Sequence, residues 1–420
     1  METELPDMQI ILITKNFPFD TMNAPAENYL INEIQYLAAK VKKVIVIATD
    51  AHRDSRLSVD LPPNVMAYNV ADTRARRKLN ILCSLIKYFA LPLETDKDEI
   101  GHSLKKRLRY AYFNGKSDYY FNCIREKLID RKVLNKDSNM VFYTFWFYTY
   151  TLTAYNLKKK YFNHAEIITR THRYDLYSER NSLNYIPMRK YLFDRIDMVF
   201  PCSEDGSKYL REKYPEYSSK IKTSYLGSED YGGNSNNGNQ LFTVVSCSRV
   251  EPVKRLDILV RTMQCISNMD KSIQWIHIGN GSQMHDIKLL AKELVENGRI
   301  AFAGAMDNKK VMEFYQTHKV DLFVNVSESE GLPISIMEAA SMGIPVLATD
   351  VGGTREIVDD SNGWLIPKDV SAQELASIIL NIREMDSVTE QKKRKASREK
   401  WQQFFNIEDN ITKLLGEINQ

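Results

Sequence analysis

The sequence predicts an α/β protein made of two parallel-sheet units. Continuous apolar runs of strand length recur in both halves of the chain, and helical patterns follow most of them. Strands of this kind are buried on both faces, which is typical of parallel sheets covered by helices. A polar, Gly/Asn-rich stretch at 231–239 separates the halves. With 420 residues, 43% of them apolar, the chain is long enough for two or three domains.

The first half opens with a βαβ pattern. Strands are predicted at 9–14 and 43–49, joined by a loop at 15–26 and a helix at 27–39. Further strands are predicted at 140–144, 165–170 and 197–201, with an aromatic-rich helix after the first of them and another helix at about 185–196. Ser203 is expected to cap the helix that follows the last strand.

Residues 74–133 interrupt this alternation with a helical, basic insert. Between Arg74 and Arg109 there are ten Lys or Arg residues and four Asp or Glu residues. Two interpretations are open. The insert is either an ordinary pair of surface helices that covers the sheet, or a surface that contacts anionic lipid head groups.

The second half repeats the pattern. Strands are predicted at 241–246, 273–278, 300–304, 322–326 and 345–349, and helices from 256, at 309–317 and at 333–342. The segment 392–418 is predicted as one long helix that lies back across the first domain. We therefore expect two Rossmann-like domains facing a central cleft, at 1–228 and 241–395, with a linker at 229–240 and a C-terminal helix at 396–420.

Composition narrows the function. The net charge of +3 is nearly balanced, so no nucleic-acid partner is expected. The five cysteines show no metal-site spacing and are predicted to be buried, reduced thiols. The first residues are acidic and enter a strand directly, so we expect no secretory signal and a cytoplasmic location. The uncharged stretch 138–157 contains too many Tyr, Thr and Asn residues for a membrane span.

A strand, an acidic turn, a helix and a second strand occupy residues 322–349. Pro333 is placed where a helix can begin, and Gly343 where it ends. The free N–H groups of such a helix favour an anion. Glu330 precedes the helix, and Glu338 lies five residues past Pro333, roughly 7–8 Å further along the helix axis.

Two carboxylates on either side of an anion site suit an extended ligand with hydroxyls at both ends, such as a nucleotide sugar. The alternative is that both acids are solvated residues at a helix end. Against it, Glu338 lies within the apolar run of residues 334–340, where a carboxylate needs a partner.

Arg249 and Lys254 follow the first strand of the second half. Taken alone, they would be a solvated basic loop. Two fixed cations there would also stabilise the charge that a diphosphate leaving group develops.

These motifs resemble the retaining GT-B glycosyltransferases of the group 1, or family 4, type. The resemblance covers nearly the whole chain and is densest at 241–370. It is carried by Arg249-x4-Lys254, Gly279-x-Gly281, Phe302-Ala-Gly304, Glu330-Gly-Leu-Pro-x4-Glu338 and Gly352-Gly353-x-x-Glu356.

The resemblance implies a role for each matching residue. Arg249 and Lys254 would hold the donor diphosphate, Glu338 the ribose hydroxyls and Glu330 the hydroxyls of the transferred sugar. The remaining donor-binding candidates are Gly279, Gly304, Gly331, Leu332, Pro333, Ile334 and Ser335. His172, in a His-x-x-Asp pattern after a strand, matches the active-site histidine of the family and joins Arg249, Lys254 and Glu330 as a catalytic candidate. Ala24-Pro25 departs from the family, which has two glycines in this first loop.

The resemblance further implies transfer of a hexose, with retention, from a nucleoside diphosphate sugar, most commonly a UDP sugar. The acceptor would be a glycan or lipid-linked glycan of cell-surface polysaccharide synthesis, and no cofactor is expected. Asp96-Lys97-Asp98 lies in the charged insert rather than after a strand, so the enzyme is predicted to be metal-independent.

Other functions are open. They are a nucleotide-sugar epimerase of the same build, a transferase for a small soluble acceptor, a glycosidase and a binding protein without activity. The basic insert adds the expectation of peripheral contact with the inner face of a membrane.

Overall fold

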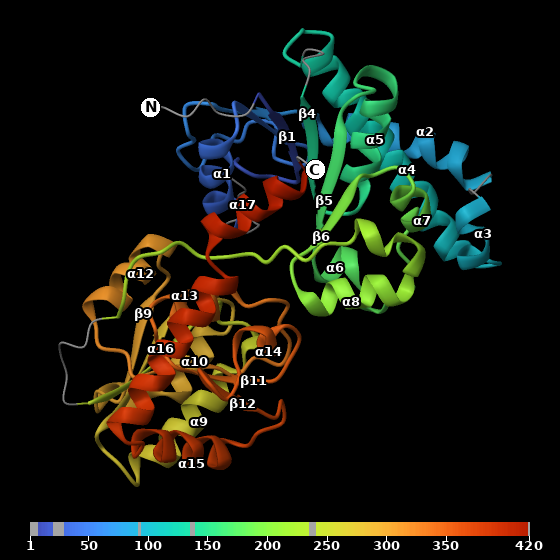
Figure 1. Ribbon diagram of the computed structural model, residues 1–420. Coiled ribbons are helices and arrows are strands. Elements are labelled where there is room, and N and C mark those ends of the chain that lie inside the picture. The colour runs from blue at the N-terminus through green and yellow to red at the C-terminus, as the bar shows by residue number, and fades with distance from the viewer. Residues whose placement is uncertain (1–6, 20–28, 91–93, 135–138, 235–240, 419–420) are drawn as a thin grey trace, which may run out of the picture. The chain divides into compact units, whose positions relative to one another are not determined.

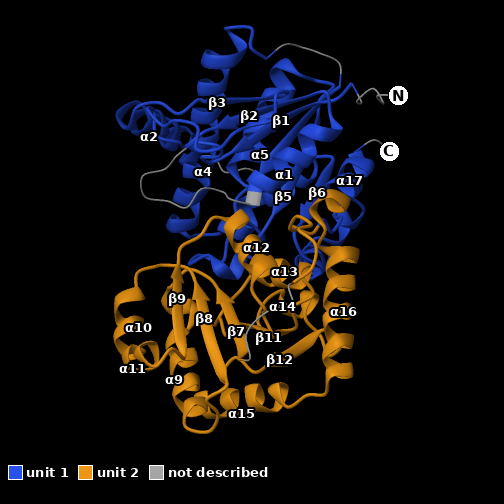
Figure 2. Ribbon diagram, turned by 90° about the vertical axis from the view of Figure 1, so that its left-hand side faces the viewer, with its two compact units in different colours: residues 1–224, 411–420 blue, residues 225–410 orange. Residues whose placement is uncertain are grey.

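The computed structural model describes residues 7–19, 29–90, 94–134, 139–234 and 241–418. The chain divides into two compact units, residues 1–224 with 411–420 and residues 225–410 (Figures 1 and 2). Each unit contains one six-stranded parallel sheet with helices on its faces. The predicted α/β class is therefore confirmed.

The sheet of the first unit has the strand order β3-β2-β1-β4-β5-β6. The strands are β1 Gln9–Thr14, β2 Lys43–Ala48, β3 Val65–Asn69, β4 Met140–Phe145, β5 Glu166–Thr171 and β6 Met198–Pro201. β1 lies between β2 and β4, with Ile11 opposite both Ile45 and Phe142. The order of the strands along the sheet reverses between β1 and β4. β3 was not predicted from the sequence, because this edge strand is only half-buried along most of its length.

The helices of this unit are α1 Tyr29–Lys40, α2 Arg74–Ala90, α3 Glu94–Ile100, α4 Leu104–Ile124, α5 Thr149–Tyr161, α6 Arg173–Leu176, α7 Arg189–Phe193 and α8 Glu204–Lys213. The predicted helix at 185–196 is wrong in extent. Asn184 and Met188 have positive φ angles, and the Met188 N–H donates to the Asp96 carboxylate, so the chain turns before α7 begins. Ser203 caps α8 as predicted, by accepting the Gly206 N–H at 3.1 Å.

A buried charged group joins β5 to α1. Arg170 is fully buried, and its Nε lies 3.4 Å from the Glu33 carboxylate, which also accepts the Tyr143 hydroxyl. Removing one partner of a buried ion pair leaves the other charge without compensation.

We expect Arg170→Met to lower the free energy of unfolding by about 3–5 kcal/mol, because the Glu33 carboxylate is then buried without its cation. The midpoint of urea unfolding measures the change. Adding Glu33→Gln should recover part of the loss. If Arg170→Met unfolds at the same urea concentration as the wild type, the ion pair does not hold α1 on the sheet.

The second unit repeats the topology, with the strand order β12-β11-β10-β7-β8-β9. Its strands are β7 Phe242–Cys247, β8 Ile273–Ile278, β9 Ile300–Gly304, β10 Leu322–Asn325, β11 Val346–Thr349 and β12 Gly363–Ile366. The order here reverses between β7 and β10. The edge strand β12 was not predicted.

The helices of the second unit are α9 Leu256–Ser267, α10 Met284–Leu290, α11 Lys292–Glu296, α12 Asn308–Thr317, α13 Ile334–Ser341, α14 Thr354–Ile357, α15 Ala372–Arg383 and α16 Ser387–Phe404. Val244 faces the apolar cluster beneath α9, α10 and α15, and its neighbour Val245 faces the cluster beneath α12, α13 and α16. Helices thus cover both faces of the sheet (Figure 2).

The predicted single helix at 392–418 is wrong. The chain forms α16 and then a separate helix, α17 Ile407–Ile418. Asn406 causes the break, because its side chain accepts the N–H groups of Glu408 and Asp409 and so caps α17. Residues 411–420 belong to the first unit, in which Glu417 lies 3.7 Å from Lys222.

Part of the predicted linker is fixed to the second unit. Residues 235–240 lie outside the described residues. In the preceding segment, Asp230 pairs with Arg398 at 2.6 Å, and the Asn234 N–H donates to the Met342 carbonyl at 3.0 Å.

The cysteines are free thiols, as expected. The prediction that all are buried holds for Cys123 and Cys202, whereas Cys247 and Cys265 are half-buried and Cys83 is exposed on α2. In the described part of the chain, no helix is long and apolar enough to cross a bilayer.

Candidate active site

The loops at the carboxyl edge of the second sheet meet where the strand order reverses. The loop after β7 spans residues 248–255, and the loop after β10 spans 326–333. The Glu328 N–H joins them by donating to the Val253 carbonyl at 2.8 Å. The Gly353 N–H, from the loop after β11, donates to the Gly331 carbonyl at 2.7 Å. Open α/β sheets bind ligands at such a reversal point.

Lys254 and Glu330 form an ion pair across this point, with Nζ 2.6 Å from Oε1. The Glu330 side chain is 8% exposed and also accepts the Asn325 amide at 3.2 Å, whereas the Lys254 side chain is 21% exposed. An ammonium group has three donors. Glu330 takes one of them, and no other described residue takes the remaining two. The pair therefore presents a cation beside a carboxylate at a fixed place.

The helix α13 begins beside Glu330. Pro333 occupies the N-cap position, with φ −76° and ψ 107°, so the helix starts at Ile334 and ends one residue earlier than predicted. The N–H groups of Ile334 and Ser335 have no acceptor among the residues that the structure describes. Together with the helix dipole, they form an anion site next to Lys254 and Glu330.

Glu338 lies in the second turn of α13 and is buried, with 7% of its surface exposed. Burial raises its pKa to about 8, although the Asn308 amide donates to the carboxylate and opposes the shift. Burial and the nearby Glu338 carboxylate also raise the pKa of Cys247. Burial therefore favours the protonated form of Glu338 over its carboxylate.

Arg249 lies on the same loop as Lys254 but is exposed, and its side chain has no hydrogen-bond or ion-pair partner among the described residues. The structure thus places the two predicted cations on one loop without joining both to the acids.

The predicted glycines have packing roles. Gly279 has a φ of +145°, and a Cβ there would lie 1.9 Å from the Ser248 carbonyl oxygen. Its N–H donates to Gly304, at the end of β9. A Cβ on Gly352 would lie 2.2 Å from the carbonyl oxygen of Glu330. These glycines let the loops after β8 and β11 pack against the loops that carry Lys254 and Glu330.

Two amide side chains in the site were not predicted from the sequence. Asn325 is the last residue of β10 and holds Glu330, and Asn308 is the first residue of α12 and holds Glu338. Asn325 could have been found, because it interrupts an apolar strand at its carboxyl end. Asn308 gave no such signal, since it lies thirty residues from its partner.

His172 belongs to the first unit and follows β5, as predicted. Its ring stacks on Trp146, which follows β4, with 5.6 Å between centroids. Asp175 of the His-x-x-Asp pattern accepts the backbone N–H groups of His172 and Phe147, each at 3.0 Å. Burial raises the pKa of Asp175 to about 6, and the bond from His172 opposes the shift. The aspartate thus fixes the backbone that carries the histidine.

The Asp96-Lys97-Asp98 segment and the first loop were the two remaining features of the sequence. Asp96 is buried, and its carboxylate accepts the Tyr185 hydroxyl and the Met188 N–H, so it joins α3 to the turn before α7. Within the described ranges, no group of three His, Cys, Asp or Glu residues could hold a metal ion. Ala24-Pro25 lies outside the described residues.

Comparisons with known proteins find sequence similarity within the second unit. Residues 231–402 match the family described as "Glycosyl transferases group 1". The O-antigen biosynthesis glycosyltransferase WbnH of Escherichia coli is 32% identical over 181 residues, which are 43% of this chain and 49% of that protein. The chain thus spans about half the length of this curated relative.

Solved structures share the fold over nearly the whole chain. Sucrose-phosphate synthase from Thermosynechococcus elongatus matches with a TM-score of 0.68 and 17% identity, covering 98% of each chain. HepE of Anabaena, solved in complex with UDP and glucose, matches with a TM-score of 0.60 and 16% identity, covering 98% of this chain and all of that one. These likenesses confirm the GT-B fold.

Proposed function

We propose that the protein is a retaining hexosyltransferase. It transfers a hexose from a UDP-linked donor to a glycan or lipid-linked glycan in cell-surface polysaccharide synthesis. The observation that carries the proposal is the Lys254–Glu330 ion pair at the start of α13, where the strand order of the second sheet reverses. The match to group 1 glycosyltransferases and the UDP complex of HepE support it.

We assign a role to each group at this edge of the sheet. Lys254 and the free N–H groups of α13 bind the donor diphosphate and stabilise the charge it gains as the bond to the anomeric carbon breaks. Glu330 accepts hydroxyls of the sugar, and Glu338, one turn further along α13, accepts the ribose hydroxyls. Arg249 adds a second cation when its side chain turns towards the phosphates.

The acceptor oxygen attacks the anomeric carbon on the face from which the diphosphate departs. A new bond from carbon to the acceptor oxygen forms as the bond to the phosphate oxygen breaks, and the acceptor proton passes to that phosphate oxygen. The anomeric configuration is thereby retained, without a dedicated base or a metal ion. His172 of the first unit is the side chain we assign to the sugar from the acceptor side.

A glycosidase is a weaker candidate, because it needs two carboxylates that face each other across one bond and has no use for Lys254. An epimerase of the same fold would change the donor without an acceptor. We place the reaction in the cytoplasm, with the lipid-linked acceptor at the inner face of the membrane.

The test is release of UDP from UDP-sugars, with and without a mixture of glycan and lipid-linked acceptors. We expect UDP release that depends on the acceptor and is unchanged by excess EDTA, and a product whose anomeric proton shows the configuration of the donor. Loss of activity with EDTA would contradict the metal-independent mechanism. Conversion of the donor without acceptor would favour the epimerase.

A further inference from the structure

Two helices of the basic insert expose large apolar side chains. On α2, Leu79, Leu82 and Ile86 are 62%, 58% and 75% exposed, and on α4, Leu104 and Leu108 are 68% and 51% exposed. Single exposed apolar side chains are ordinary, but a contiguous group indicates a surface that another body covers.

The exposed residues of α2 form one stripe. At about 100° per residue, positions 75, 79, 82, 83, 86 and 90 fall on one side of the helix. All six are apolar or cysteine. The opposite side carries Ile81, Leu85 and Tyr88, which pack into the core of the unit. One apolar face of α2 already packs on the core, so the stripe is a second apolar face that the core does not bury.

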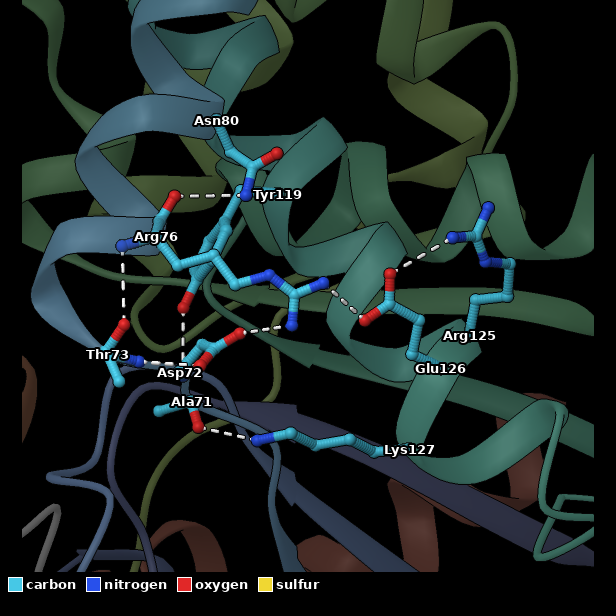
Figure 3. A network of polar contacts seen from close by, with 9 residues as sticks. All are labelled: Ala71, Asp72, Thr73, Arg76, Asn80, Tyr119, Arg125, Glu126 and Lys127. Carbon is cyan, nitrogen blue, oxygen red and sulfur yellow. Dashed lines mark hydrogen bonds and ion pairs between the residues drawn. The ribbon is translucent and has the colours of Figure 1, made fainter.

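Polar contacts hold α2 in this orientation. Arg76 bridges Asp72 at 2.7 Å and Glu126 at 2.8 Å, and so ties the start of α2 to the segment after α4 (Figure 3). Further along, a Cβ on Gly115 of α4 would lie 2.9 Å from the Ser84 Cβ, so the two helices are in close contact. The stripe therefore faces outward because the other sides of α2 are fixed.

The apolar surface continues onto α4. The helices are antiparallel, because Gly115 lies against Ser84 whereas the Arg107 guanidinium lies 5.8 Å from the Phe89 ring. Leu104 and Leu108 share the helix face of Gly115, which is the side of α4 turned towards α2. They lie beyond the end of α2 and stay uncovered there. Figure 1 shows α2 outside α4, away from the sheet.

The charges near the stripe indicate that its binding partner is anionic. α2 contains Arg74, Arg76, Arg77, Lys78 and Lys87 and no acidic residue. Arg74 and Lys78 are exposed and have no ion-pair partner among the described residues. Cations beside an outward apolar stripe are typical of helices that lie in the interface of an anionic bilayer.

We propose that α2 docks on an anionic membrane, with Leu79, Leu82 and Ile86 entering the boundary between head groups and acyl chains, and Leu104 and Leu108 beside them. Lys78, which lies one turn before Leu82 at the edge of the stripe, contacts the lipid phosphates. This inference goes beyond the proposed function. The proposed function includes a lipid-linked acceptor, but it does not say which surface of the protein contacts the membrane.

Co-sedimentation of the full-length protein with vesicles tests the proposal. We expect binding to vesicles of phosphatidylglycerol and phosphatidylcholine, and little to phosphatidylcholine alone. The variant Leu79→Gln/Leu82→Gln/Ile86→Gln should bind anionic vesicles at least tenfold more weakly, because three apolar side chains no longer enter the bilayer. Raising salt should weaken the wild type further.

The control removes equally exposed side chains elsewhere. Met269, Leu289 and Val388 of the second unit are 72%, 68% and 60% exposed, and their triple Gln variant should bind vesicles as the wild type does. Vesicle binding that the stripe variant retains would overturn the proposal. A second result would also overturn it: light scattering shows that the wild type is a dimer and does not bind vesicles, and that the stripe variant is a monomer. A second copy of the chain would then cover α2. The stripe variant should still transfer sugar to a soluble acceptor at the wild-type rate. Membrane docking can therefore fail while the proposed activity remains.

Discussion

Lys254→Ala should lower kcat by a factor of about 100 to 1,000, because the departing diphosphate loses the cation that stabilises its developing charge. Among the described residues, the carboxylate of Glu330 would then keep a bond from Asn325 alone. Glu330→Gln should give a loss of similar size, and the double variant should lose little more, since the two residues act as one unit. Initial rates of UDP release at saturating donor and acceptor measure each loss.

A neighbouring pair provides the control for this experiment. Lys368 and Glu328 lie 3.8 Å apart, and each side chain is 58% exposed. Such an exposed pair contributes little, so Lys368→Ala should keep kcat within about twofold of the wild type. Circular dichroism of all variants checks that they fold. If Lys254→Ala and Glu330→Gln both turn over at near-normal rates, the proposed mechanism is wrong.

Glu338→Gln should remove a pH dependence from both stability and donor binding. In the folded protein the pKa of Glu338 is about 8, against the usual value of 4.5 that it has in the unfolded chain. Between these values the folded state keeps a proton that the unfolded state releases. The free energy of unfolding therefore falls as the pH rises from about 4.5 to about 8, by up to about tenfold in the equilibrium constant per pH unit.

Urea unfolding at pH 5 and pH 8 measures this effect, and the pH dependence should be smaller in Glu338→Gln than in the wild type. A raised pKa means that burial of Glu338 costs stability at pH 8, so the Gln variant should be the more stable one there. Equal pH dependence in the two proteins would show that Glu338 is already ionised when the site is empty.

Donor binding gives a second measure of the same group. Ribose hydroxyls that donate to Glu338 favour its ionised form, so the wild type should release up to one proton when UDP binds at pH 7. Calorimetry in two buffers of different ionisation enthalpy detects that proton. Glu338→Gln should release none and should bind UDP at least tenfold more weakly. A wild-type binding enthalpy that is the same in both buffers would contradict the assignment.

The sequence predicted the strands that carry the site, because those strands are long, continuous apolar runs between clear turns. It missed β3 and β12, which lie at the edges of the sheets and have fewer buried residues. It also joined α16 to α17, because the apolar period continues through the break. The helix stops there because Asn406 caps α17 and because the backbone of Ser228 bonds to Phe405 and Ile407.

Within the site, the motifs pointed to Lys254, Glu330 and Glu338, but the contacts among them depend on the order of the strands. Lys254 and Glu330 are 76 residues apart and meet because β7 and β10 are neighbours in the sheet. The exposed stripe of α2 could not be predicted from the sequence either. An apolar face looks the same in a sequence whether it covers a core or faces outward, and only packing against α4 shows which face is free.

A crystal structure with bound UDP would show whether the start of α13 is the diphosphate site. We predict that the diphosphate lies at the start of α13, with its oxygens within about 3 Å of Lys254 Nζ and of the N–H groups of Ile334 and Ser335. A diphosphate bound elsewhere, with Lys254 still paired to Glu330 alone, would contradict the account.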